Sequence, residues 1–303
     1  VERFIALTHE RYYAELGDEF SKSIPSIFTD EPQFKCKQYF DFAGERKALL
    51  FPFTDDLPDT YRQTYGCDLM DTLPELFWEI RGWSQARYRY HDHLCDRFTQ
   101  AYPQTIGDWC ARHNLPLTGH VNAEQNLTSQ TDYIGEAMRS YPHFGIPGID
   151  LLMDRHEFST LKQAQSIVHQ CGREGMLSEL YGVTNWDFDF KGHKRQGDWQ
   201  AALGVTLRVP HLCWMTMRGE AKRDYPASIF YQSPWYQEYP LIENHFARLN
   251  TALTRGACDI HVGVVHPVES YWLHWGPREQ TAAVRQEMDD HYFGAIKPRV
   301  AEF

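Results

Sequence analysis

The sequence predicts an α/β fold built from parallel strand–helix units. Short apolar runs alternate with amphipathic helical stretches along the 303 residues, and polar residues gather just after the carboxyl ends of several runs. No internal repeat or low-complexity tract interrupts this order. In such folds ligands bind where the parallel strands end. The polar residues at the strand ends are therefore the first candidates for a functional site.

The elements follow from local signals in chain order. Residues 2–20 form a helix because their apolar side chains recur at helical spacing. Pro32 stops the strand that residues 26–28 begin, since proline has no amide hydrogen for a strand interior. The predicted strands are residues 26–28, 115–121, 145–152, 176–179 and 205–215. The predicted helices are residues 2–20, 69–80, 83–112, 128–141, 159–173, 196–203 and 234–255.

Glycines mark two of the expected helix irregularities. Gly107 is the expected break within the helix over 83–112, and Gly256 closes the helix over 234–255. Residues 33–66 carry few periodic stretches and are expected to be a long excursion between elements.

The pattern changes near residue 258. Residues 260–267 (IHVGVVHP) read as one more apolar strand, and VESYW follows it. We place a domain boundary there, which divides the chain into residues 1–257 and 258–303. The chain also opens on Val1 within a helical pattern, so we expect it to be a piece of a longer protein.

Composition excludes several classes of protein. Apolar residues make up 42% and aromatics 15%, enough for a sizeable core and too much for general disorder. The net charge of −11 argues against a nucleic-acid partner, and no apolar run approaches the ~18 residues of a membrane span. Seven cysteines are odd in number and widely spaced, which indicates free thiols and slightly favours a cytoplasmic location.

Two glutamates stand at strand ends in settings that point to glycosidic cleavage. Glu31 lies in the sequence FTDEP and Glu179 in LSELYG, each directly after an apolar run. Cleavage of a glycosidic bond needs one carboxylic acid to protonate the leaving oxygen and one carboxylate to attack the sugar or activate water. The plain alternative for either glutamate is a solvated or helix-capping carboxylate.

The FTDEP segment resembles the Asn-Glu-Pro type motif at the end of the fourth strand of clan A glycoside hydrolases. The resemblance implies a (β/α)8 TIM-barrel type fold, with Glu31 as the acid/base of strand 4 and Glu179 as the nucleophile of strand 7. The run over 208–215 would be strand 8. The chain would then hold about strands 4–8 of an incomplete barrel, leaving an exposed sheet edge.

Several stretches are similar to large bacterial proteins identified as glycosyl hydrolases, distantly related to family 42 β-galactosidases and in part to α-L-rhamnosidases. These stretches are residues 28–32, 119–124, 146–150, 162–163, 178–182, 219–226 and 266–272. The last is similar to the start of the amidotransferase-like domain that follows the barrel in such enzymes. The resemblance also implies a homo-oligomer of the full-length protein. Asp30 stands where the clan has the Asn that commonly binds the sugar 2-hydroxyl.

The remaining candidates are expected to bind the sugar. They are Asp30, His120, Glu124, Asp150, Tyr181, Trp186 and Trp214. Tyr181 would hydrogen-bond the nucleophile, and the two tryptophans would stack on apolar faces of the substrate. Core packing is the plain alternative for these aromatic side chains.

We expect no resident metal or cofactor. His91 and His93 are two residues apart on a predicted helix and point to different faces, and HExxH, GxSxG and P-loop sequences are absent. The leading hypothesis is a retaining O-glycosyl hydrolase acting on an oligo- or polysaccharide. Its rivals are a non-catalytic carbohydrate-binding barrel and a metal-assisted hydrolase using His120, Glu124 and other groups at the strand ends.

Overall fold

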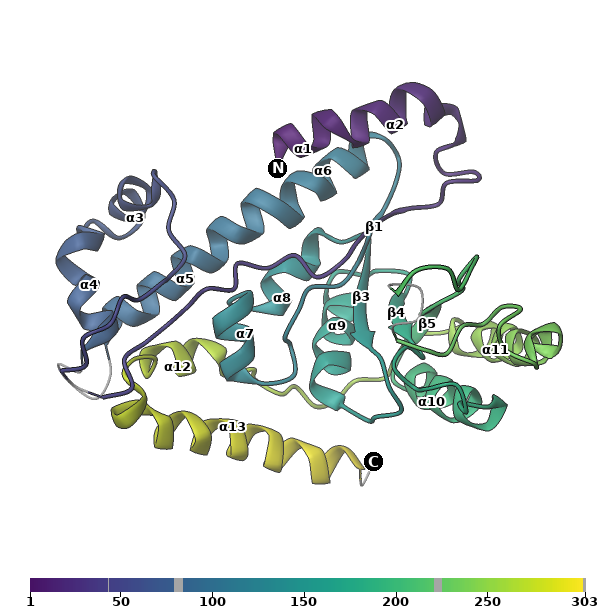
Figure 1. Cartoon of the computed structure of the whole chain (residues 1–303). Coiled ribbons are helices and arrows are strands. Elements are labelled where there is room, and N and C mark those ends of the chain that lie inside the picture. The colour runs from purple at the N-terminus through teal and green to yellow at the C-terminus, as the bar shows by residue number, and fades with distance from the viewer. Residues whose placement is uncertain (43, 79–83, 221–224, 302–303) are drawn as a thin grey trace.

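A five-stranded parallel sheet forms the centre of the molecule (Figure 1). The computed structural model describes residues 1–42, 44–78, 84–220 and 225–301. The strands are β1 (Ile27–Thr29), β2 (Leu117–Gly119), β3 (Ile146–Leu151), β4 (Met176–Leu180) and β5 (Val205–Pro210). Each lies within two residues of a predicted run, except that β5 ends five residues early. The predicted α/β class with a parallel sheet is confirmed.

The strands are wound in one direction. Their order in the sheet is β1-β2-β3-β4-β5, so each strand pairs in parallel with the next one along the chain. Doubly wound sheets reverse direction at a switch point, whereas barrels do not. Because parallel crossovers are right-handed, one direction of winding places the helices on a single face. This winding is compatible with part of an α/β barrel, while closure of a full barrel stays a prediction.

Helices connect the strands and extend the molecule on both sides. Those before β2 are α1 (Glu2–Leu7), α2 (His9–Leu16), η1 (Gly17–Glu19), α3 (Leu57–Tyr65), α4 (Leu69–Phe77), α5 (Gln85–Thr99), η2 (Gln100–Gln104) and α6 (Thr105–Arg112). Those after β2 are α7 (Leu127–Tyr133), α8 (Ala137–Ser140), η3 (Tyr141–His143), α9 (Phe158–Gln170), α10 (Phe190–Ala202), η5 (Tyr236–Glu238), α11 (Pro240–Leu253), α12 (Val268–Leu273) and α13 (Arg278–Ala301). Parts of two predicted stretches, residues 79–83 and 221–224, lie outside the described residues.

The long helix before β2 is irregular at a proline rather than at Gly107. Helices α5 and α6 are joined by the π-helical η2, which contains Pro103. Proline removes one backbone hydrogen bond and crowds the preceding turn. Gly107 stays helical, and a Cβ there would lie 2.4 Å from the carbonyl oxygen of His143. The glycine therefore allows close packing and does not break the helix.

The two faces of the sheet differ in what covers them. Ile149 and Leu151 are fully buried in the core cluster that includes residues of α9. On the other face, Asp150 pairs in register with Glu179, and Glu179 with Val209. Residues in register share a face of a sheet. Val209 is 36% exposed there, so the face that carries the carboxylates is the open one.

The C-terminal segment does not form the strand that its apolar alternation predicts. Residues 260–267 carry no strand and are mostly exposed, because no described strand pairs with them. Helix α12 follows and packs against α5 and α7, burying Val268, Tyr271 and Trp272. The predicted strand is therefore wrong, while the proposed domain boundary near 258 stays a prediction.

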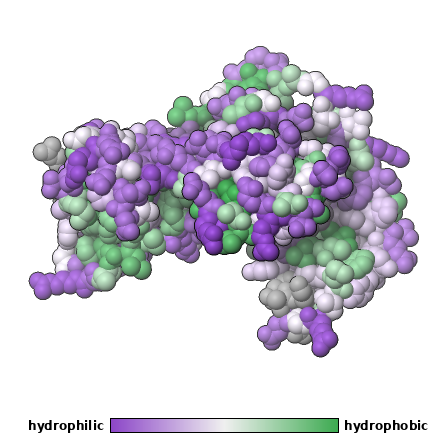
Figure 2. Space-filling view, turned by 90° about the horizontal axis from the view of Figure 1, so that it is seen from above, coloured by the Kyte–Doolittle hydropathy of each residue, from purple (hydrophilic) through white to green (hydrophobic). Residues whose placement is uncertain are grey.

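The surface is consistent with the acidic, polar composition. Figure 2 shows a face that is mostly hydrophilic, with apolar areas separated from one another. Among the described residues, no helix combines the length and the apolar character that crossing a bilayer requires.

The contact between β1 and β2 depends on Gly119, and its replacement should destabilise the fold. Gly119 has φ +114°, and a Cβ there would lie 2.0 Å from the carbonyl oxygen of Thr29. We expect Gly119→Ala to lower the free energy of unfolding by about 3 kcal/mol, measured by urea denaturation. Gly66→Ala is the control, because Gly66 has φ +70° and no atom near the added Cβ. It should cost only about 1 kcal/mol, and equal losses at the two positions would contradict the packing argument.

Candidate active site

A buried histidine lies at the centre of the carboxylates. His120 directly follows β2, is fully buried, and its backbone amide donates to the carbonyl of Thr29 on β1. Its Nε2 lies 2.9 Å from Oε2 of Glu179, at the end of β4, and 3.8 Å from Oδ1 of the exposed Asp30. The strand-end positions of β1, β2 and β4 thus bring Asp30, His120 and Glu179 together.

The hydrogen bonds of His120 indicate an imidazolium. Nε2 faces the Glu179 carboxylate, and Nδ1 faces the carbonyl oxygen of Val121 at 3.3 Å. Two acceptors require two N–H donors, which only the protonated ring supplies. Burial lowers the pKa of His120, but the hydrogen bond to Glu179 and the charges of Asp150 and Glu124 outweigh it and raise the pKa to about 9.

Glu31 lies close to the same histidine. One of its carboxylate oxygens, a ring nitrogen of His120 and a carboxylate oxygen of Asp150 all lie within 4.8 Å of one another. Asn122 donates a hydrogen bond of 2.9 Å to Oε2 of Glu31. Burial is the largest influence on Glu31 and raises its pKa; His120 opposes this, and the charges of Asp30 and Glu179 add to it.

The backbone at Glu31 is in an unusual conformation. Its φ is +43°, and Ala123 and Tyr181, just beyond the ends of β2 and β4, also have positive φ. Such angles are disfavoured for residues with side chains and concentrate at functional sites, where the surrounding structure holds them. The turn at Glu31 immediately follows the strand and precedes Pro32.

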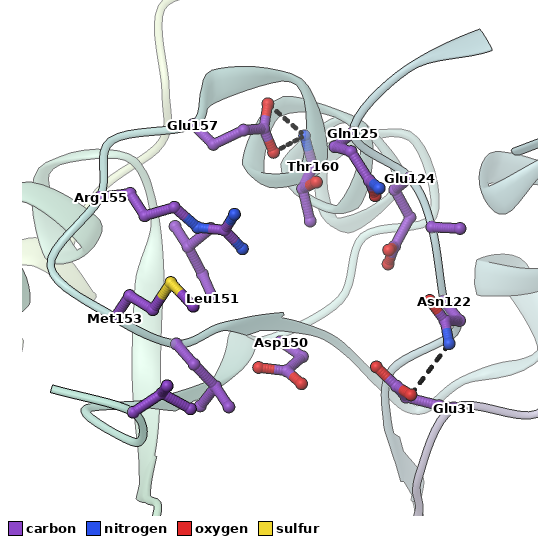
Figure 3. Close-up of a pocket in the computed structure, with 13 residues that line it drawn as sticks. Glu31, Asn122, Glu124, Gln125, Asp150, Leu151, Met153, Arg155, Glu157 and Thr160 are labelled. Atoms are coloured by element: carbon purple, nitrogen blue, oxygen red, sulfur yellow. Dashed lines mark hydrogen bonds between the residues drawn. The ribbon is translucent and has the colours of Figure 1, made fainter. Parts of the chain in front are cut away.

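A cavity of about 250 Å³ opens beside these groups (Figure 3). Glu31, Glu124, Asp150 and Arg155 line it, and Figure 3 shows the Asp150 carboxylate lying between Leu151 and Glu31. Oδ1 of Asp150 is buried and has no hydrogen-bond partner among the described residues. Burial is the main cause that raises the pKa of Asp150 to about 7, with Glu179 and Glu31 contributing against His120. Among the described residues, neither Glu179 nor His120 belongs to the cavity lining; the two side chains contact each other near Asp30.

Hydrogen bonds fix both the carboxylate and the backbone carbonyl of Glu124. Its carboxylate accepts a hydrogen bond of 2.6 Å from the hydroxyl of Tyr141, and its carbonyl accepts from Gln130 and Gln163. Burial raises its pKa, and the Tyr141 hydrogen bond works against that rise. Glu124 is thus both a lining residue and a fixed part of the core.

The aromatic candidates are not brought to the carboxylates in the expected way. Tyr181 is 1% exposed, and its hydroxyl donates to the carbonyl of His193 rather than to Glu179. We correct that expectation: Tyr181 packs in the core with Phe188. Trp214 is also buried, edge-on to Trp186 at 5.6 Å, so it offers no free stacking face; Trp186 is 38% exposed.

Asn122, Arg155 and Glu157 are among the lining residues that were not predicted. Asn122 binds Glu31, Arg155 extends toward the cavity, and Glu157 caps α9 by accepting from the amides of Ser159 and Thr160 (Figure 3). All three residues follow predicted strands, and this position is the sequence signal that could have identified them. Nothing in the sequence indicated how far the loop over 152–157 folds back over the strand ends.

Two overlapping groups of side chains have the spacing of metal ligands. They are Asp30, His120 and Glu179, and Glu31, His120 and Asp150, each with its candidate ligand atoms within 4.8 Å of one another. A protonated imidazole cannot bind a metal, so a cation here would first have to displace the proton from His120.

The ion pair between His120 and Glu179 should make stability depend on pH. Because the pKa of His120 rises from 6.5 to about 9 on folding, its contribution is complete below pH 6.5 and is lost as the pH rises through 9. We expect the stability advantage of wild type over His120→Gln to fall by up to about 3 kcal/mol between pH 6.5 and 10. Urea unfolding at several pH values measures it. His169→Gln, at an exposed position on α9, is the control, and parallel pH curves for wild type and His120→Gln would contradict the ion pair.

Comparison with known proteins gives a structural likeness only. No family model and no curated protein matches the sequence. The solved structure of a rhamnosidase from Novosphingobium sp. PP1Y is similar, with a TM-score of 0.62 and 18% identity over 84% of this chain and 24% of that one. The chain therefore spans about a quarter of the length of that rhamnosidase. At this identity the likeness shows a shared fold.

Proposed function

We propose that the protein is a retaining glycoside hydrolase in which Glu31 is the general acid/base and Glu179 the nucleophile. The observation that carries the proposal is the placement of both carboxyl groups around the one histidine, His120, at the carboxyl edge of a parallel sheet. The likeness to a rhamnosidase fold supports the same class of reaction.

The surroundings of the two glutamates suit different roles. The imidazolium of His120 donates to Glu179, so a fixed positive charge lies beside the side chain proposed as the nucleophile. Burial raises the pKa of Glu31, which favours the protonated form that a general acid needs. Two carboxyl groups in unlike settings are the usual arrangement for acid/base and nucleophile in glycosidases.

The reaction follows from these roles. Glu31 transfers its proton to the glycosidic oxygen as Glu179 attacks the anomeric carbon, so that the glycosidic bond breaks and a glycosyl ester forms. Glu31, now ionised, takes a proton from water, and that water attacks the anomeric carbon and releases Glu179. Asn122 would steady Glu31 through both steps, since it donates to Oε2.

A panel of nitrophenyl glycosides tests the proposal. The rhamnosidase likeness makes the α-L-rhamnoside the first substrate to try, followed by β-galactoside and the other common pyranosides. We expect turnover of at least one glycoside, with the first-formed sugar retaining its anomeric configuration by NMR. Binding of sugars without any turnover would favour the non-catalytic barrel, and a first product of inverted configuration would remove the nucleophile role of Glu179.

Metal-assisted hydrolysis is the second candidate, because the side chains around His120 have ligand spacing. Asp30, Glu179 and a deprotonated His120 would hold a divalent cation, which would polarise a substrate oxygen or activate water. Activity that disappears on dialysis against EDTA and returns with Ca²⁺ or Zn²⁺ would favour this mechanism. Activity unchanged by EDTA is expected if the two glutamates act alone.

A further inference from the structure

A second cluster of buried polar groups lies outside the cavity. It consists of Lys37 in the segment after β1, His91 on α5, Thr131 on α7, Trp272 on α12 and Arg285 on α13. Each of these residues is at most 8% exposed. None of them lines the cavity beside Glu31. We call this set the donor cluster.

The hydrogen bonds of Lys37 fix the state of His91. Lys37 Nζ donates to the carbonyl of Thr131 and lies 2.8 Å from Nδ1 of His91. With Lys37 charged, its ammonium group has only donors, so Nδ1 is then the acceptor and the ring hydrogen is on Nε2. That Nε2 is buried and has no hydrogen-bond partner among the described residues. His91 therefore presents an unused N–H donor.

Three further groups in the cluster are also unused. Nε and Nη1 of Arg285, Nε1 of Trp272 and Oγ1 of Thr131 are buried and without hydrogen-bond partners in the described part of the chain. The arginine and tryptophan nitrogens can only donate. Buried donors are costly to leave unpaired, most of all on a charged group. What these buried donors lack is a hydrogen-bond acceptor.

The groups belong to elements that pack together. Helix α12 contacts both α5 and α7, and α13 contacts α7. The ring of His91 lies 6.1 Å from that of Trp272 and 4.9 Å from that of Trp275. The Arg285 guanidinium lies over Tyr39, whose ring packs edge-on against Trp275.

The cluster also carries an excess of positive charge. Burial and then the charges of Lys37, Arg87 and Arg285 lower the pKa of His91, so several cations act on this ring. Burial lowers the pKa of Lys37 to about 7, against the opposing charge of Asp132. Asp132 is an acidic side chain beside the cluster: it accepts from the indole of Trp275, and the charges of both Lys37 and Arg285 act on it. A buried guanidinium such as that of Arg285 normally has an anionic partner.

We propose that the donor cluster binds a small monovalent inorganic anion, of the size of chloride, between α5, α7, α12 and α13. Such an ion accepts from Arg285, His91 and Trp272 together and balances the local charge. Because every member of the cluster is enclosed, the ion has to be small. The bound anion ties the C-terminal helices α12 and α13 to the sheet domain through α5 and α7.

Halide-dependent stability tests the proposal, with bromide as the probe. Thermal unfolding is followed while sodium bromide replaces sodium gluconate at constant ionic strength. Because the anion binds the folded state, Tm should rise by about 3 °C toward 200 mM bromide and level off. Crystals soaked in bromide should show an anomalous peak within hydrogen-bond distance of Arg285 and His91.

Two arginines on one helix provide the matched variants. Arg285→Met should abolish the bromide effect on Tm, and Arg285→Lys should keep part of it. Arg278→Met is the control: Arg278 also lies over Tyr39, but it is exposed and pairs with Asp41. It should keep the full effect. A wild-type Tm that does not respond to bromide at constant ionic strength would overturn the proposal and leave ordered water as the acceptor.

Discussion

Replacing Glu179 by glutamine should lower kcat on the best nitrophenyl glycoside on the order of 10⁴-fold. The amide keeps the shape of the side chain but cannot attack the anomeric carbon. Because a neutral amide also leaves the buried imidazolium of His120 without its counter-charge, the variant should become less stable as well. Steady-state kinetics at saturating substrate, with circular dichroism to confirm folding, measures both effects.

Small anions distinguish a nucleophile from a residue that only positions the substrate. Glu179→Ala leaves room beside His120, and added azide should restore turnover of an activated glycoside by forming the glycosyl azide. Glu174→Gln is the matched control, since Glu174 is exposed and lies just before the opposite end of β4. Rates close to wild type for Glu179→Gln would remove the nucleophile assignment.

The strands could be predicted because each is short, apolar and ended by a local signal. β1 ends just before Asp30-Glu31-Pro32, and β3 and β4 are mostly apolar runs whose acidic residues, Asp150 and Glu179, come next to last. The same reasoning failed for residues 260–267, since apolar alternation makes a strand only where another strand can pair with it. Local sequence says nothing about that partner. The irregularity at Pro103 rather than Gly107 likewise follows from proline chemistry that the pattern of apolar residues does not reveal.

The site residues that lie at the ends of the strands could be predicted from the sequence. Glu31, His120, Asp150 and Glu179 follow or end neighbouring parallel strands, and the structure brings them together. The direction in which the Tyr181 side chain points could not be predicted. The positive φ of Tyr181 turns the chain after β4, and its hydroxyl donates to the carbonyl of His193.

The loop residues needed three-dimensional information. Asn122 and Arg155 reach the cavity only because the chain bends back after β2 and β3. Ala123 makes the bend after β2 in a left-handed conformation, and because it is not a glycine the sequence does not indicate this turn. The donor cluster joins five segments from Lys37 to Arg285. Such a junction depends on how helices pack, which residue spacing alone does not encode.

Replacing Glu31 by glutamine should give a loss that depends on the leaving group. A general acid matters most when the departing oxygen is a poor leaving group, so kcat/KM should fall about 10⁴-fold for an alkyl glycoside or disaccharide. The loss should be much smaller for a dinitrophenyl glycoside, whose leaving group departs without a proton. Parallel assays of the two substrates measure this difference. Both assays use the same Glu31→Gln protein, so a folding defect would lower both rates equally.

The pH profile gives a second readout of the same residue. In wild type the alkaline limb of kcat/KM should report loss of the Glu31 proton, and burial, which raises the pKa of Glu31, places that limb above the range of an ordinary glutamate. Glu31→Gln should lose the limb. Asn122→Ala should move it to higher pH, because the amide of Asn122 donates to Oε2 and so favours the ionised carboxylate. Equal losses on both leaving groups with an unchanged alkaline limb would show that Glu31 binds the sugar without transferring a proton.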